Sequence, residues 1–277
     1  DDSEDRNRWS AAMEKLLQHH GVPAICCGSG PTHDFQPNTV EIAMDNIRAS
    51  LQTPQGVVQV ESPLVGRFNV ENIMTTLAIA FAMKIDMSRA AESLARARGA
   101  PGRLERITSA NGGPAGAAVF VDYAHTPDAL LNVLRTLQGL PHNRLICVFG
   151  CGGDRDRAKR PLMGSIAARY ADIAVVTDDN PRSEPPGEIL QQILKGIHEE
   201  RLEPKDEDWL LNRGEGRGFV VLGDRREAIR AAVQSAGADD IVIIAGKGHE
   251  KYQLTNQGRR FFDDSLEVRQ AMLSWDR

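Results

Sequence analysis

Residues 144–161 read "RLICVFGCGGDRDRAKRP", and this stretch decides the fold. An unbroken apolar run, 145–149, leads into a loop with three glycines, after which the pattern predicts a helix over 159–170. An apolar strand without polar alternation is typical of a sheet whose two faces are both covered. The stretch therefore predicts one strand–loop–helix unit of a parallel sheet.

The same strand-then-helix pattern occurs five times in a row in the second part of the chain. The other four units pair a strand with the helix that follows it: 117–122 with 127–138, 172–177 with 187–198, 218–223 with 226–236, and 240–246 with a helix near 264–274. Such a series predicts an α/β fold with a doubly wound, Rossmann-like, mostly parallel sheet and helices on both of its faces. The polar residues 199–217 are expected to form a loop.

The first hundred residues have a different pattern. The expected elements are a helix over 4–19, a strand over 23–28, antiparallel strands within 39–62, and helices over 69–84 and 88–98. "GAPGR" at 99–103 then indicates a hinge. We therefore expect two domains, 1–101 and 102–277. The first has too few strands to be complete, so the chain is expected to be a fragment of a longer protein.

Composition argues against several classes of function. The chain has 277 residues and a formal net charge of −5, which argues against binding nucleic acid through a general basic surface. Its longest apolar runs are strand-sized and no secretory signal is recognisable, so a cytoplasmic protein without membrane insertion is expected. The spacing of the four cysteines fits neither a zinc site nor a disulfide framework, and they are expected to be small core residues.

The carboxyl ends of the predicted strands carry unusual loops, and ligands of open parallel sheets bind at such ends. In "VDYAHTPDAL" (121–130), Thr126 is expected to cap a helix, while Asp122 suits a ribose hydroxyl and His125 suits a base. An ordinary polar turn is the alternative. In the opening stretch, the three glycines and Arg155 with the cations after it favour an anion, although the loop is not a Walker A sequence.

A third loop places opposite charges close together. In "DDNPR" (178–182), Pro181 keeps Asn180 extended, Asp179 offers an acceptor, and Arg182 offers a planar fork for a carboxylate. Charges of both signs suit an amino acid. A local ion pair between Arg182 and an aspartate is the alternative.

The fourth loop, "AGKGHEKYQ" (245–253), and two stretches before it complete the set of candidates. Gly246 permits close approach and Glu250 suits an ammonium group, although a generic turn also explains a single loop of this kind. Asn69 and Asn72 lie one turn apart at a helix start and suit an adenine edge, with a plain helix cap as the alternative for Asn69. Arg103, at the hinge, suits a phosphate.

Six motifs stand in the order seen in the Mur ligases of peptidoglycan synthesis. They are "GRFNVEN", "GRLE", "DYAHTPDAL", "CGGDRDRAKRP", "DDNPR" and "AGKGHEKYQ", and the set resembles the diaminopimelate-adding members of that family. The resemblance implies that meso-diaminopimelate is joined to UDP-MurNAc-L-Ala-D-Glu through an acyl phosphate made with ATP. It also implies that 1–101 is the last part of a central ATP-binding domain and 102–277 the C-terminal amino-acid-binding domain.

The family's phosphate loop and Mg²⁺ ligands are expected upstream of this chain, so no metal ligand is expected within it and no activity is expected from it alone. The resemblance implies nucleotide contacts for Asn69, Asn72, Arg103, Asp122 and His125, with Arg103 also catalytic. It implies contacts to the incoming amino acid for Arg155, Asp179, Asn180, Pro181, Arg182, Gly246 and Glu250. Lysine would leave Arg182 without a carboxylate partner, so this residue favours diaminopimelate.

Two other interpretations remain open. A ligase similar to folylpolyglutamate synthetase would share the architecture, but "DNPR" and "GHEKYQ" argue against it. A stand-alone amino-acid-binding module is the non-enzymatic alternative, and tight binding of diaminopimelate by this chain without nucleotide would favour it.

Overall fold

The structure is a computed structural model that describes residues 2–30, 32–108 and 117–273 of the chain. It divides into two compact units, Asp1–Ala97 and Arg98–Arg277. Each unit has its own hydrophobic core. The division falls just before the "GAPGR" stretch at which the sequence indicates a hinge.

The second unit is built on a six-stranded sheet with the order β4-β5-β9-β6-β7-β8. Its strands are β4 (Glu105–Ile107), β5 (Ala118–Asp122), β6 (Leu145–Phe149), β7 (Ile173–Val176), β8 (Gly218–Val221) and β9 (Ile241–Ala245). Neighbouring strands are parallel except β4 and β5, which are antiparallel. The predicted mostly parallel α/β fold is confirmed, and the short edge strand β4 is an addition to it.

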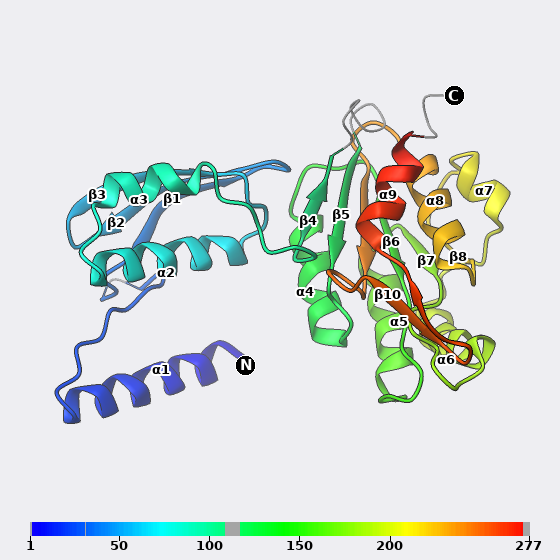
Figure 1. Cartoon of the computed structure of the whole chain (residues 1–277), viewed down its shortest axis with the longest axis horizontal. Coiled ribbons are helices and arrows are strands. Elements are labelled where there is room, and N and C mark those ends of the chain that lie inside the picture. The colour runs from blue at the N-terminus through cyan, green and yellow to red at the C-terminus, as the bar shows by residue number, and fades with distance from the viewer. Residues whose placement is uncertain (1, 31, 109–116, 274–277) are drawn as a thin grey trace. The chain divides into compact units, whose positions relative to one another are not determined.

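Helices cover both faces of this sheet (Figure 1). On one face lie α4 (Pro127–Gln138), α5 (Lys159–Tyr170) and α6 (Pro186–Glu199), and on the other lie α8 (Arg225–Ser235) and α9 (Asp264–Leu273). Val119 and Val121 belong to the core beneath α8 and α9, whereas Phe120 between them points to the opposite face. All three are buried, which explains why the strand sequences lack polar alternation.

Two segments expected to be loops contain regular structure. Within 199–217, the helix α7 (Glu207–Leu211) begins after Asp206, whose carboxylate accepts a hydrogen bond from the backbone of the helix. After β9, the strands β10 (Tyr252–Thr255) and β11 (Gly258–Phe261) form an antiparallel hairpin. Because β11 is exposed along its whole length, its sequence has no apolar alternation from which a strand is predicted.

The first unit combines helices with a small antiparallel sheet in the order β1-β2-β3. Its elements are α1 (Asp2–His19), β1 (Gln36–Ile42), β2 (Ile47–Thr53), β3 (Gly56–Ser62), α2 (Phe68–Ala82) and α3 (Met87–Leu94). The antiparallel strands and all three helices predicted for this part are confirmed. The strand predicted over 23–28 is wrong, because only Cys27 forms a bridge there, to Phe35.

All four cysteines are free thiols. Burial raises the pKa of Cys147 and that of Cys151 to about 12, so both are unreactive core residues. Among the described residues, no group of three or more His, Cys, Asp or Glu side chains is arranged to hold a metal ion. Within the same ranges, no helix is both long and apolar enough to cross a membrane.

Candidate amino-acid-binding site

The carboxyl ends of the parallel strands lie at one edge of the sheet, where a pocket of about 520 Å³ opens among their loops. The loops after β5, β6, β7 and β9 all contribute to its lining. Predicted site residues that line it are His125, Arg155, Asp179, Asn180, Arg182, Gly246 and Glu250. Pro181 instead lines an adjoining pocket of about 230 Å³, which shares Arg182 with the first.

A larger pocket of about 620 Å³ lies at the opposite, amino-terminal edge of the strands. The protein itself engages guanidinium groups that line it. Arg144 pairs with Asp240 at 2.6 Å, and Arg217 donates to the carbonyls of Ala168 and Ala171 at the end of α5. Cations at a helix C-terminus stabilise the helix, which accounts for Arg217 without a ligand. The candidate site is therefore the smaller pocket at the carboxyl edge.

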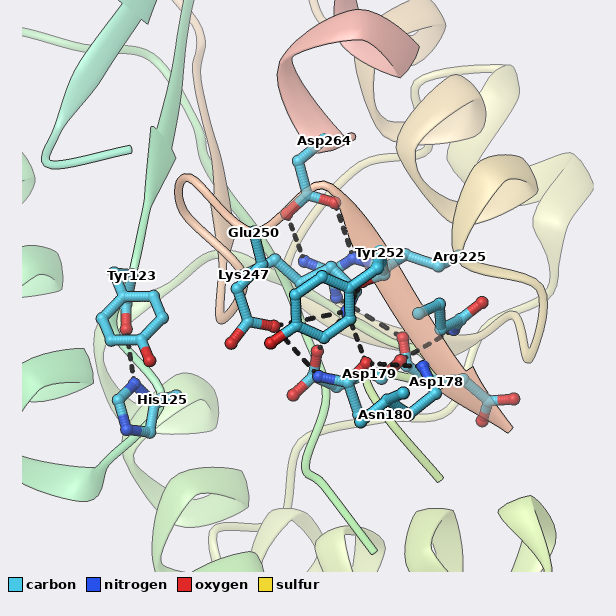
Figure 2. Close-up of polar contacts among 12 residues, drawn as sticks. Tyr123, His125, Asp178, Asp179, Asn180, Arg225, Lys247, Glu250, Tyr252 and Asp264 are labelled. Atoms are coloured by element: carbon cyan, nitrogen blue, oxygen red, sulfur yellow. Dashed lines mark hydrogen bonds and ion pairs between the residues drawn. The ribbon is translucent and has the colours of Figure 1, made fainter. Parts of the chain in front are cut away.

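A buried lysine holds the loop after β7 from within the protein (Figure 2). Lys247 Nζ donates to Asn180 Oδ1 and to the Tyr252 carbonyl, both at 2.8 Å. It lies 3.2 Å from Asp179 Oδ1 and 3.8 Å from Glu250 Oε2. Asn180 Nδ2 in turn donates to Glu250 Oε2 at 3.1 Å. Three predicted binding residues thus form one network around a cation to which the sequence interpretation gave no role.

Arg182 lies between the two adjoining pockets. Its backbone is left-handed, with φ +54°, which is uncommon for a residue other than glycine. Its Nη1 donates to the Gly153 carbonyl at 2.8 Å. The alternative of an ion pair between Arg182 and an aspartate is wrong for the described residues, in which this side chain donates only to carbonyls. Its Nε and Nη2 have no partner among those residues, so they remain available to a carboxylate.

Two of the three glycines in the loop after β6, Gly150 and Gly153, have a different role from the one expected. Gly153 N donates to the Asn180 carbonyl at 2.9 Å, so this N–H is not free for an anion. A Cβ atom at Gly150 would overlap the Thr177 carbonyl oxygen, and one at Gly153 would overlap that of Pro181. The glycines therefore let this loop pack directly against the loop after β7.

The arginines after these glycines differ in whether the protein itself pairs their charge. Arg160 is buried and donates to both carboxylate oxygens of Glu184, at 2.9 and 3.0 Å. Hydrogen bonding by Arg160 lowers the pKa of Glu184 to about 2. Arg157 also pairs with Glu184, at 3.2 Å. Arg155 lines the pocket and, within the described residues, donates only to the Asp154 carbonyl, so its charge remains available to an anion.

An aromatic ring brings together two residues predicted to contact the nucleotide. His125 Nδ1 lies 2.8 Å from the Tyr123 carbonyl oxygen, and the two rings meet edge-on with their centroids 4.4 Å apart. Arg103 Cζ lies 4.8 Å from the centroid of the Tyr123 ring. Thr126 caps α4 as predicted, since its hydroxyl accepts from Ala129 N at 3.3 Å. Arg103 and His125 thus both contact Tyr123, at the end of β5.

The carboxylate of Asp122, the last residue of β5, accepts hydrogen bonds from backbone N–H groups that lie before and after it in the chain. Its Oδ2 accepts from Leu104 N at 2.6 Å and its Oδ1 from Ala124 N at 2.8 Å. Burial raises the pKa of Asp122, and these two hydrogen bonds oppose the increase. The carboxylate therefore fixes the chain that leads into β4. Each oxygen keeps a second lone pair, and the contact with ribose stays a prediction.

Asn69 and Asn72 belong to α2 in the first unit. They lie on one face, as predicted, because Asn72 Nδ2 donates to Asn69 Oδ1 at 3.0 Å. The alternative that Asn69 is the helix cap is wrong, since Arg67 holds the cap position and Asn69 donates back to the Val65 carbonyl at 2.8 Å. Their contact with adenine stays a prediction.

A second buried cation lies at the same edge of the sheet. Arg225 donates to both oxygens of Asp264, at 2.8 and 2.7 Å, and to the Ala245 carbonyl at 3.1 Å (Figure 2). The sequence interpretation gave no role to Lys247, Arg225 or Asp264. Only Lys247 has a local signal, because it stands between two glycines directly after a buried strand.

An open parallel sheet with a charged pocket at its carboxyl edge defines a small-molecule-binding α/β domain. Comparison with protein families then shows that the chain belongs to the Mur ligases. Residues 102–248 match the family model described as "Mur ligase, glutamate ligase domain". The family expected from the six motifs is thereby confirmed.

Individual relatives agree with this assignment. The chain is 41% identical over 257 residues to the UDP-N-acetylmuramoyl-L-alanyl-D-glutamate–2,6-diaminopimelate ligase of Geobacter metallireducens, covering 93% of this chain and 50% of that protein. A solved structure of a ligase with the same name is 40% identical with a TM-score of 0.66, covering 90% of this chain and 47% of the other. The chain thus spans about half the length of the relatives it matches.

A more distant likeness shows the fold alone. A crystal structure of a folylpolyglutamate synthase from Thermotoga maritima has a TM-score of 0.60 at 16% identity, and it covers 83% of this chain and 47% of that one. The shared architecture that underlies the alternative ligase interpretation is therefore present. The sequence similarity is much higher to the diaminopimelate ligases.

Proposed function

We propose that this chain is the amino-acid-binding part of a cytoplasmic ligase that joins meso-diaminopimelate to UDP-MurNAc-L-Ala-D-Glu with ATP. The D-glutamate carboxylate would attack the γ-phosphate of ATP, releasing ADP and leaving an acyl phosphate. The amino group of diaminopimelate would then attack that carbonyl, losing a proton and expelling phosphate as the amide forms. The names of the similar ligases support this assignment.

The observation that carries the proposal is the charge pattern of the pocket. Arg155 and Arg182 provide guanidinium groups, and Asp179 and Glu250 provide carboxylates, in one cavity of about 520 Å³. Diaminopimelate carries two ammonium groups and two carboxylates, so charges of both signs on the ligand find opposite partners. Lysine has one carboxylate fewer and would leave a guanidinium group unpaired.

In this arrangement Arg182 binds the distal carboxylate of diaminopimelate, and Asp179 and Glu250 receive an ammonium group. Asn180 holds the Glu250 carboxylate in place through its side-chain amide. Gly246 lines the pocket, and its φ of +124° is a conformation that favours glycine. The contribution of these residues to the reaction is to position the attacking nitrogen.

For the nucleotide, we propose the contacts that the motifs imply. Asn69 and Asn72 would bind adenine, Asp122 the ribose, and Arg103 the phosphates, with His125 beside them. The contact of Arg103 with the Tyr123 ring supports a fixed position for its guanidinium group. The described residues include no cluster that fits a magnesium ion, so we derive no step through that metal.

Substitution of Arg182 tests the proposed substrate. In the natural protein that carries this chain, Arg182→Ala should raise KM for meso-diaminopimelate by at least about 100-fold, because charge-assisted hydrogen bonds are lost. KM for ATP should stay unchanged. Steady-state kinetics with each substrate varied in turn would measure both constants.

Arg201→Ala is the matched control for this substitution. Arg201 is also an arginine with a left-handed backbone, φ +57°, but it is exposed and does not line the pocket. It should therefore leave both constants near those of the unmodified protein. Equal KM values in Arg182→Ala and the unmodified protein would refute the role of Arg182. Absence of any diaminopimelate-dependent ligation by the unmodified protein would refute the proposed function.

A further inference from the structure

Lys247 supports the pocket without lining it. Its side chain is fully buried, with 0% exposure, and it is not among the residues that line the cavity. It nevertheless lies among the side chains of Asp179, Asn180 and Glu250, all of which do line the cavity (Figure 2). Lys247 is therefore placed to act on a ligand only through its neighbours.

Most of the hydrogen-bonding capacity of the Lys247 ammonium group is used within the protein. An ammonium group has three donors. Two of them go to Asn180 Oδ1 and to the Tyr252 carbonyl, both at 2.8 Å. Nζ also lies 3.2 Å from Asp179 Oδ1, an oxygen that accepts no hydrogen bond within the described residues. This contact is an ion pair, so the charge of Lys247 is directed at a residue that lines the cavity.

The charge of Lys247 offsets the repulsion between two carboxylates. Asp179 and Glu250 both lie within 3.8 Å of its nitrogen, and both are largely shielded from water. Without a cation, carboxylates in such a setting take up a proton or move apart. Two negative charges and one positive charge leave the cluster with a net charge of −1, which the ammonium group of an arriving amino acid would neutralise.

The burial of this lysine is itself costly, which argues that its charge has a use. Burial lowers the pKa of Lys247, and the nearby Asp179 opposes that change. A buried cation is stable only when it is paired and hydrogen-bonded, and here the partners are the proposed binding residues themselves.

We propose that Lys247 is a positioning residue for the amino-acid substrate. Its ammonium group fixes Asp179, Asn180 and Glu250 in the arrangement in which the two carboxylates receive the substrate's ammonium group. This inference rests on the proposed function, because it takes the pocket to bind an amino acid.

Substrate-specific kinetics of the natural protein test the inference. Lys247→Met removes the charge and keeps an unbranched side chain. We expect KM for meso-diaminopimelate to rise roughly 10- to 100-fold. Removing a residue that orients a metal ligand changes affinity by this amount, and Lys247 would orient the binding carboxylates in a similar way. KM for ATP and for UDP-MurNAc-L-Ala-D-Glu should change by less than about twofold, because the role proposed for the cluster is to bind the amino acid alone. Lys251→Met, an exposed lysine in the same loop, is the matched control and should change none of the three constants.

A second variant separates loss of charge from loss of folding. Lys247→Gln removes the charge but keeps a hydrogen-bond donor for Asn180 and Tyr252, so it is less disruptive than methionine. It should also raise KM for diaminopimelate selectively. An unchanged KM in this variant, or an equal loss of affinity for all three substrates, would overturn the positioning role while the proposed function stands. Failure of the unmodified protein to ligate diaminopimelate would instead refute the proposed function.

Discussion

Charged residues at the carboxyl edge of the sheet differ in whether an opposite charge is paired with them. Arg225 and Lys247 are each paired with a carboxylate, at 2.7 and 3.2 Å respectively. Asp178 is in the opposite situation. Burial, together with the nearby Asp224, raises the pKa of Asp178 to about 6, although Arg260 and Arg225 oppose this change. Asp178 therefore changes its ionisation within the range of pH in which enzymes are commonly studied.

The raised pKa of Asp178 predicts a pH-dependent effect on stability. In the unfolded chain an aspartate has a pKa of about 3.9, so the folded state binds this proton more tightly. Stability is therefore lost as pH rises from about 4 to 6, and the cost is constant above that window. Asp178→Asn should raise the melting temperature, and by more at pH 8 than at pH 5. Thermal unfolding at both pH values would measure this, and an increase of equal size at each would contradict the assignment.

Where polar side chains directly follow an apolar strand, the sequence indicates which residues meet at the carboxyl edge of the sheet. Asp179, Arg182 and Glu250 were predicted from polar side chains that directly follow apolar strands, and the structure places all three in one pocket. Arg225 was missed because nothing near it in the sequence shows that it is buried. Its partner Asp264 lies 39 residues further along the chain, and only the folded sheet brings the two together.

At the scale of elements, the loops after β6 and β7 are interlocked by close backbone packing. Gly153 both donates to the Asn180 carbonyl and leaves room for that of Pro181. The hairpin β10–β11 holds the same loop from the other side, since Leu254 N donates to Asn180 Oδ1 at 2.9 Å. The loop that carries the proposed specificity residues is thus fixed by two other elements.

Substitution at Gly153 tests this interlocking. A Cβ atom there would overlap the Pro181 carbonyl oxygen and lie 3.2 Å from Glu184 Cβ. Gly153→Ala should cost roughly 1–3 kcal/mol of stability through overpacking, and it should raise KM for diaminopimelate as the loop shifts. Denaturant unfolding and steady-state kinetics would measure the two effects.

Gly187→Ala is the control for that variant. Gly187 lies in the first turn of α6, and a Cβ atom there meets nothing within 4 Å. Its replacement should be neutral or stabilise the protein by up to about 1 kcal/mol, since alanine has less backbone freedom to lose. Equal destabilisation by both substitutions would show that close packing at Gly153 is not the cause.

Whether a strand of the second unit can be predicted from the sequence depends on its burial and its length. The strands β5, β6, β7 and β9 have unbroken apolar runs because both faces are covered, and all of them were predicted. The strand β4 is only three residues long, and β11 is fully exposed, so neither has an apolar pattern. Both segments are strands because they pair with a neighbouring strand, and the periodicity of the sequence does not reveal that pairing.

At the scale of the whole molecule, the chain consists of two units with separate cores. The first core joins β2 and β3 to α2 and α3 around Phe35, Ile47 and Leu77. The second joins the parallel sheet to α8 and α9 around Val148, Val175 and Ile244. The boundary between the units follows the end of α3, and the exposed residues Arg96 and Arg98 lie on either side of it.

Limited proteolysis tests the independence of the second unit. Trypsin should cleave after Arg96, Arg98 or the exposed Arg103 and leave a resistant fragment that begins between residues 97 and 104. Buried strands protect the rest of that unit from early cleavage. Mass spectrometry of the fragments would identify the cut. Early cleavage after Arg225 or Lys247, which are both fully buried in the second unit, would contradict the division.

The left-handed backbone at Arg182, with φ +54°, has an evolutionary consequence. Glycine accepts this conformation without the strain of about 1 kcal/mol or more that most other residues incur. Mutational drift from arginine to glycine at this codon would therefore relax the loop while removing the guanidinium group. In the role proposed for Arg182, selectivity for a second carboxylate is thus opposed by the backbone strain of the loop that provides it.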